Sequence, residues 1–144
     1  MTSDAYDLER FVVAQDARGT YAFAVAELRA GRKVTHWMWF VFPQIAGLGM
    51  SETSRRYAIS SLVEARRYLA HPILGERLRE CARALTELEG RTADDVFGHV
   101  DAVKLRSSMT LFARAAPEDP LFAEVLDLYF QGVADDATDA RLRG

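Results

Sequence analysis

The chain has 144 residues, of which 49% are hydrophobic and 27% charged, and its formal net charge is −3. These values are ordinary for a globular protein, so they do not indicate a disordered or membrane-spanning chain, and we expect one domain over residues 1–144. The negative net charge predicts no binding to nucleic acid or to an anionic membrane. The sequence does not open with a basic segment followed by an apolar one, so we expect no signal peptide. The expected location is therefore the cytoplasm.

Residue types that usually hold metals or form disulfides are few. Cys81 is the single cysteine, so no internal disulfide can form. His36, His71 and His99 are dispersed along the chain without the spacing of a metal site. We therefore predict no metal site and no cofactor.

Apolar residues at helical spacing, interrupted by capping and stop signals, recur along the whole chain. Two patterns resemble capping boxes and begin at Ser61 and Thr92. Glycines after several patterns are typical helix stops, as at Gly31 and Gly98. The other predicted N-caps are Ser3 or Asp4, Thr20, Thr35 and Asp101. The predicted helices cover residues 6–15, 21–30, 36–41, 61–69, 74–88, 92–98, 101–115 and 119–130.

The most regular apolar stripe lies in residues 74–88, where apolar side chains recur every three or four positions. No stretch alternates with a period of two between hairpin turns, so a sheet is not expected. The sequence therefore predicts an all-α fold, a compact bundle of about six to eight short helices around one core.

The least ordinary segment is HWMWFVFPQ, residues 36–44. One interpretation places its rings at the centre of the core, because exposed tryptophans and phenylalanines would form a sticky patch. The other makes Trp37 and Trp39 part of a ligand pocket. His36 and Gln44 bracket the rings with groups that donate and accept hydrogen bonds, and the glycines of residues 47–49 add backbone freedom.

Basic and hydroxyl residues elsewhere could complete such a pocket. Arg55 precedes Tyr57 closely, and Lys104 and Ser107 share one side of a predicted helix. Together they could hold an anion, whereas the alternative is a solvated face with hydroxyls bonded to helix carbonyls. The candidate ligand-binding residues are His36, Trp37, Trp39, Gln44, Arg55, Tyr57, Lys104 and Ser107.

These residues predict a pocket for a planar anionic small molecule, such as a nucleotide or an ADP-ribose derivative. The alternative is an interaction module without catalytic activity, in which an exposed face binds another protein or a second copy of the chain. No pair of acid and base residues and no nucleophile motif stands out, so no catalytic residue is named and the question of enzymatic activity stays open.

Several blocks of the sequence resemble the domain of unknown function 1810 family over nearly the whole chain. The blocks are DLERFVVAQ (residues 7–15), GRK through HWMWFVFPQ (31–44), GLG (47–49), HPILG (71–75) and DAVKLRSSMTLF (101–112). The resemblance implies a multihelical fold and brings no established activity. A looser similarity in size and helical character is to the NADAR class, named for links to NAD and ADP-ribose chemistry, from which no catalytic position is carried over.

Overall fold

The computed structural model describes residues 4–143, and the helices in this range confirm the predicted all-α fold. Among these residues the β-type pairing is limited to an isolated bridge between Ile45 and Ile59. In chain order the elements are α1 (Glu9–Asp16), the 3₁₀ helix η1 (Ala17–Gly19), α2 (Thr20–Ala30), α3 (Met38–Val41), α4 (Glu52–Arg56), α5 (Leu62–Ala70), α6 (Leu74–Thr86), α7 (Ala93–Ala115), α8 (Leu121–Phe130) and α9 (Asp136–Arg143).

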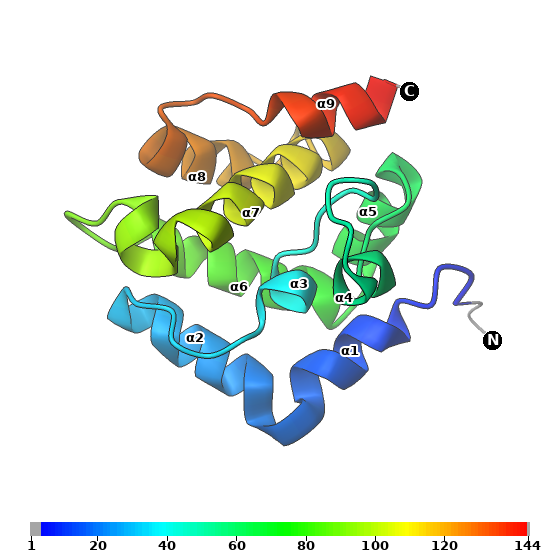
Figure 1. Cartoon of the computed structure of the whole chain (residues 1–144), viewed down its shortest axis with the longest axis horizontal. Coiled ribbons are helices and arrows are strands. Elements are labelled where there is room, and N and C mark those ends of the chain that lie inside the picture. Colours follow the sequence, from blue (N-terminus) through cyan, green and yellow to red (C-terminus); the bar gives the residue numbers. More distant parts are fainter. Residues whose placement is uncertain (1–3, 144) are drawn as a thin grey trace.

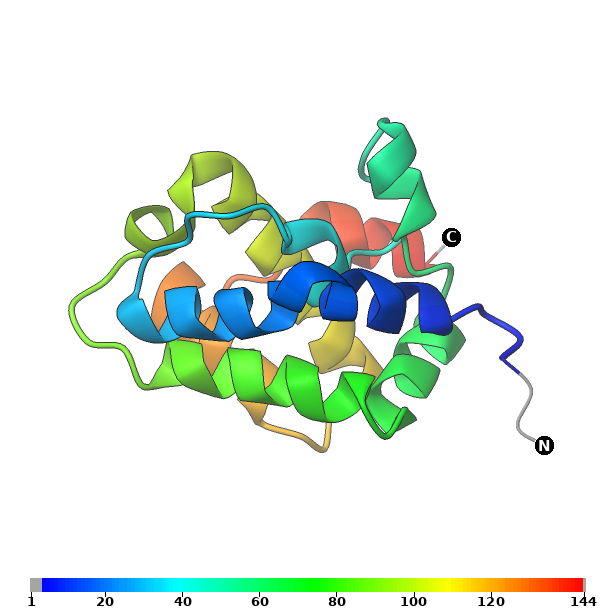
Figure 2. The same cartoon turned by 90° about the horizontal axis from the view of Figure 1, so that it is seen from below.

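Helix α7 runs through the middle of the bundle and packs against α5, α8 and α9 (Figure 1). Helix α6 packs against α2, α5 and α8, and it runs alongside α2 in Figure 2. Helix α4 stands out from the rest of the molecule in the same view. No helix within residues 4–143 is both long and apolar enough to cross a membrane.

Large side chains from α1, α5, α7 and the aromatic segment meet in the core. Phe11, Tyr68 and Phe112 are fully buried there, and the Tyr68 ring lies 5.1 Å from Phe11 and 5.4 Å from Phe112 between ring centroids. Trp37 and Phe42 are buried as well, with centroids 6.2 Å apart. Burial of such rings is the main apolar stabilisation of a core.

The helix-start signals were predicted with mixed success. At Thr92 the capping box is confirmed: its hydroxyl accepts from the Asp95 amide, and the Asp95 carboxylate accepts from the Thr92 amide. Ser61 caps α5 through the Glu64 amide, but the Glu64 carboxylate turns to Ser60 and does not close the box. Gly98, with φ 75° and ψ 162°, bends α7 where a stop was predicted.

Several of the predicted N-caps are wrong. The Thr20 hydroxyl donates to the Ala17 carbonyl, and the Thr35 hydroxyl donates to the Glu27 carboxylate. Asp101 lies inside α7, where it pairs with lysines. At the first helix the N-cap is Leu8 and not Asp4, although the Asp4 carboxylate accepts from the Leu8 and Glu9 amides at the start of α1. The alternative cap, Ser3, lies outside the described residues.

Two helices were not predicted. Helix α4 consists of a single short turn in which no apolar stripe can be read. Helix α9 has the polar sequence DATDARLR, and only Thr138 of it is buried. Both lie next to the cavity described below, so these omissions bear on the site.

Candidate functional site

A loop of residues 44–59, the 44–59 loop, is closed by backbone hydrogen bonds at its base. The Ala46 amide donates to the Ile59 carbonyl, and the Ile59 amide donates to the Gln44 carbonyl, each at 2.8 Å. Helix α4 lies within this loop, and the Ser51 hydroxyl caps it by accepting from the Ser54 amide at 3.1 Å. Compact surface loops whose ends adjoin often carry function.

The 44–59 loop and Trp39 of α3 enclose a cavity of about 120 Å³. The structure thus brings four of the eight candidate residues around one space: Trp39, Gln44, Arg55 and Tyr57. The remaining lining residues are Ile45, Ala46, Gly47, Leu48, Gly49, Ser54 and Ala58.

The side-chain amide of Gln44 is the unusual polar group of this cavity. Its Nε2 atom is buried and has no hydrogen-bond partner within residues 4–143. A buried donor without a partner costs about 1–3 kcal/mol, and almost all buried polar groups in proteins have one. Solvent does not reach Nε2 in the structure, so a ligand acceptor in the cavity would remove this cost when the Gln44 amide turns toward it.

Aromatic rings form two walls of the cavity. The Tyr57 ring is held by the core, since its centroid lies 5.4 Å from that of Phe40 and 5.9 Å from that of Phe11. Trp39 is partly buried, and the Nζ of Lys104 lies 4.1 Å from the centroid of its ring. An ammonium over an indole is a favourable cation–π contact.

Lys104 belongs to a charged trio behind Trp39. Asp101 accepts from Lys104 at 3.1 Å and from Lys33 at 3.0 Å, and the Lys33 side chain is only 7% exposed. Burial alone would raise the pKa of Asp101, but the hydrogen bonds from the two lysines outweigh it and the pKa is lowered. Two ammonium groups share one carboxylate, which leaves the trio with a net charge of +1.

Three other candidate residues lie away from the cavity. His36 is exposed and does not line it, so His36 and Gln44 do not bracket a common space. Trp37 is 1% exposed and donates from Nε1 to Glu27 at 3.0 Å. The Ser107 hydroxyl shares its one proton between the Val103 carbonyl at 3.2 Å and the Asp135 carboxylate at 3.1 Å, which ties α7 to the start of α9. Trp37 and Ser107 therefore stabilise the fold through these contacts and do not face the cavity.

Glu27 explains why Trp37 is held in the core. Its carboxylate also accepts from the Val34 and Thr35 amides and from the Thr35 hydroxyl. Burial would raise the pKa of Glu27, but these hydrogen bonds prevail and lower it to about 2. Glu27 therefore orders the segment that leads into α3.

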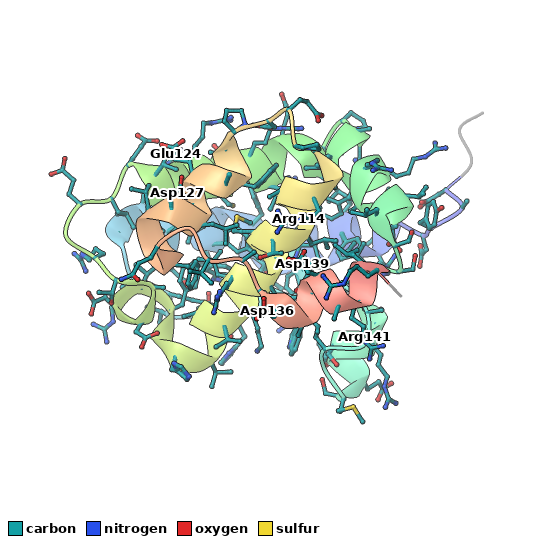
Figure 3. All side chains as sticks on the ribbon, turned by 90° about the horizontal axis from the view of Figure 1, so that it is seen from above. Arg114, Glu124, Asp127, Asp136, Asp139 and Arg141 are labelled. Atoms are coloured by element: carbon teal, nitrogen blue, oxygen red, sulfur yellow. The ribbon has the colours of Figure 1, made fainter. Side chains whose placement is uncertain are left out.

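Sequence reasoning missed Arg141 of α9, which packs on the outside of the 44–59 loop. Its Nη2 donates to the Gly47 carbonyl at 3.0 Å, and Figure 3 shows Arg141 reaching from α9 toward the segment that carries α4. A Cβ at Gly47 would lie 2.4 Å from the Arg141 guanidinium carbon, so only glycine allows this approach. Asp135 followed by acidic and then basic residues is a helix signal that could have revealed α9.

Residues suited to metal binding do not gather in the part of the chain that the structure describes. No group of three or more His, Cys, Asp or Glu side chains within residues 4–143 is placed to hold a metal ion. The set that lines the cavity contains neither a carboxylate nor a histidine or cysteine. Its chemistry is that of aromatic faces, one amide and a guanidinium.

Comparison with known proteins places the chain in a family. Residues 5–142 match the model of a family described as "Protein of unknown function (DUF1810)". The chain belongs to the DUF1810 family. This confirms the resemblance drawn from the sequence blocks. Among curated proteins, none matches the sequence.

A DUF1810-like fold is also found in a solved structure. The chain is similar to the crystal structure of the conserved hypothetical protein Rv1873 from Mycobacterium tuberculosis, with 50% sequence identity and a TM-score of 0.94. The match covers 98% of this chain and 99% of that one. The two proteins therefore share the multihelical fold over their whole matched length. The relative is called a conserved hypothetical protein, a name that states no activity.

Proposed function

We propose that this DUF1810 protein binds a planar anionic small molecule, such as a nucleotide or an ADP-ribose derivative, at the cavity of the 44–59 loop. The observation that carries the proposal is the buried, unpaired Nε2 of Gln44, a residue that lines the cavity together with Trp39 and Tyr57. A planar ring with a carbonyl or ring-nitrogen acceptor would stack against these walls and accept from Gln44.

The size of the cavity limits how much of a ligand can enter. Pockets that enclose a whole ligand usually have about 300–1,000 Å³, whereas a cavity of about 150 Å³ holds benzene. At about 120 Å³ the cavity takes one ring or one group of similar size. The rest of a nucleotide would lie outside, where the exposed Arg55 is available.

The lining residues favour binding over acid–base chemistry. General acids and bases in proteins are most often histidines and carboxylates within hydrogen-bond reach of the substrate, and the lining set offers neither. The positive side chains near the cavity, Arg55 and Lys104, suit an anion. We therefore propose a binding site and assign no reaction to it.

The two tryptophans allow a direct test by NMR. We expect millimolar AMP or ADP-ribose to shift the indole N–H signal of Trp39 and the amide signals of Gly47 and Gly49. The indole signal of Trp37 is the internal control, because this ring is buried and bonded to Glu27. Unchanged spectra, or equal shifts of both indoles, would contradict the proposal.

Matched variants sharpen the same test. Gln44→Met should weaken AMP binding about three- to tenfold, because one hydrogen bond to the ligand is lost. Ser107→Ala should leave the affinity unchanged, since the Ser107 hydroxyl is engaged with Val103 and Asp135. Equal losses in both variants would show that Gln44 has no special role.

The alternative is an interaction module without catalytic activity. In that case the chain would form a dimer or recruit a protein partner, and nucleotides would leave its spectra unchanged. Light scattering across a dilution series distinguishes the two: a concentration-dependent mass together with unchanged spectra supports the module, and a monomer that binds AMP supports the ligand site.

A further inference from the structure

We infer that Arg141 of α9 and Arg55 of α4 form an oxyanion subsite, for a phosphate or a carboxylate, at the edge of the cavity. This inference rests on the proposed function and adds where the charged part of the ligand binds. The sequence analysis did not predict that these two arginines belong to one site, because α4 and α9 were not predicted.

The geometry around Gly47 brings Arg141 against the outside of a segment that lines the cavity. Gly47 lines the cavity and has a φ of +98°, a conformation that favours glycine. The Arg141 guanidinium packs directly against its backbone and donates to its carbonyl at 3.0 Å. Arg55 lines the same cavity from the last turn of α4. Arg55 thus lines the cavity itself, and Arg141 contacts the lining residue Gly47 from outside the lining set.

Both guanidinium groups have donors to spare. A guanidinium has five N–H donors, and Arg141 uses one on Gly47. Within residues 4–143 neither Arg55 nor Arg141 forms an ion pair. Asp139, on the same helix as Arg141, already accepts from the Nε and Nη2 of Arg114 at 2.9 and 3.0 Å.

Lys104 is a weaker receptor for the anion than this pair. Its ammonium already donates to Asp101 and lies on the face of Trp39, so much of its charge is compensated. A planar fork of donors also matches the two oxygens of a phosphate or carboxylate better than an ammonium does. The charge distribution therefore directs the anionic group to the side of α4 and α9.

The test compares charged and neutral probes of the same ring. We would measure the affinities of AMP and adenosine, and of nicotinate and nicotinamide, for the intact chain by NMR titration. Arg141→Gln removes the charge and retains a donor for the Gly47 carbonyl. Arg143→Gln, on the same helix and equally exposed, is the matched control.

In Arg141→Gln we expect AMP or nicotinate to bind about tenfold more weakly, with the neutral partner unchanged. Arg143→Gln should change neither affinity. A loss limited to AMP assigns the subsite to phosphate, and a loss limited to nicotinate assigns it to carboxylate. Equal losses for charged and neutral probes, or equal effects of the two variants, would overturn the inference while the proposed site stands.

Inorganic phosphate separates the subsite from the ring-binding cavity. We expect it to shift the amide signals of Gly47 and Gly49 in the wild type and not in Arg141→Gln. If none of the four organic probes binds, the proposed function fails, and the phosphate titration alone decides the subsite. Shifts that persist unchanged in Arg141→Gln, or no shifts in the wild type, would then overturn the inference as well.

Discussion

Replacing Gln44 by methionine should stabilise the protein, although the residue lines the proposed site. The substitution removes a buried Nε2 donor that has no partner, and this donor costs about 1–3 kcal/mol. Methionine has a similar length and fills the same space, so little cavity cost is added. We expect a gain of about 1 kcal/mol in the free energy of unfolding, which raises Tm by about 3–4 °C in a chain of this size.

The matched control is Gln15→Met. Gln15 is 2% exposed, but its Nε2 donates to the Phe40 carbonyl at 2.8 Å and to the buried Tyr68 hydroxyl at 3.3 Å. Methionine there leaves two buried groups unpaired, so we expect a loss of about 2–4 kcal/mol. Urea unfolding and calorimetry measure both variants. If Gln44→Met loses as much stability as Gln15→Met, the Gln44 amide is satisfied in solution and the reasoning is refuted.

Three further predictions concern the scaffold. Gly47→Ala should lower the free energy of unfolding in urea by about 1–3 kcal/mol, because alanine is strained at the Gly47 φ of +98°. Arg141→Ala should lower it by less. Equal losses would argue that the loss in Gly47→Ala comes from the broken guanidinium contact and not from backbone strain. Asp101→Asn should cost about 3 kcal/mol because the buried Lys33 ammonium loses its counter-charge and keeps only its hydrogen bond to the Thr35 carbonyl. Asp139→Asn breaks a pair with the half-exposed Arg114 and should cost less than 1 kcal/mol in the same assay. The pKa of Glu27 is about 2 in the folded protein against an ordinary value of 4.5, so the stabilisation from its carboxylate is present above pH 4.5 and is lost as the pH falls toward 2. The free energies of unfolding of the wild type and of Glu27→Gln should therefore converge between pH 6 and pH 3. A constant difference between the two would contradict this.

The helices that sequence reasoning found are those in which local and tertiary signals agree. In α6 an apolar stripe of regular spacing faces the core, and Leu74, Leu78 and Leu85 are fully buried as expected. In α8, which the sequence predicted as a helix over 119–130, Leu126 is buried while Leu128 is 56% exposed. The helix packs on one side only, and single-residue spacing cannot decide which of two neighbouring leucines faces that side.

The parts of the site that escaped prediction depend on contacts between distant residues. Asp101 reads as an N-cap because aspartate favours that position, yet two lysines hold it inside α7. Arg141 lies 94 positions from Gly47 along the chain, and nothing local to either residue indicates their contact. Such contacts follow from the packing of α9 on α7, where Asp135 accepts from Ser107 and Asp139 accepts from Arg114.

Different residues of the aromatic segment, residues 36–44, fit its two interpretations as core and as pocket wall. Trp37 and Phe42 lie in the core, whereas Trp39 lies beside the cavity with Lys104 over its ring. Trp37 is the N-cap residue before α3 and Trp39 lies within α3, and residues two positions apart around a helix point to nearly opposite sides, so the start of α3 separates the two indoles. The same turn therefore anchors the 44–59 loop to the core through one tryptophan and presents the other to the cavity. A substitution at Trp37 then tests the fold, and one at Trp39 tests the proposed site only when stability is measured alongside binding.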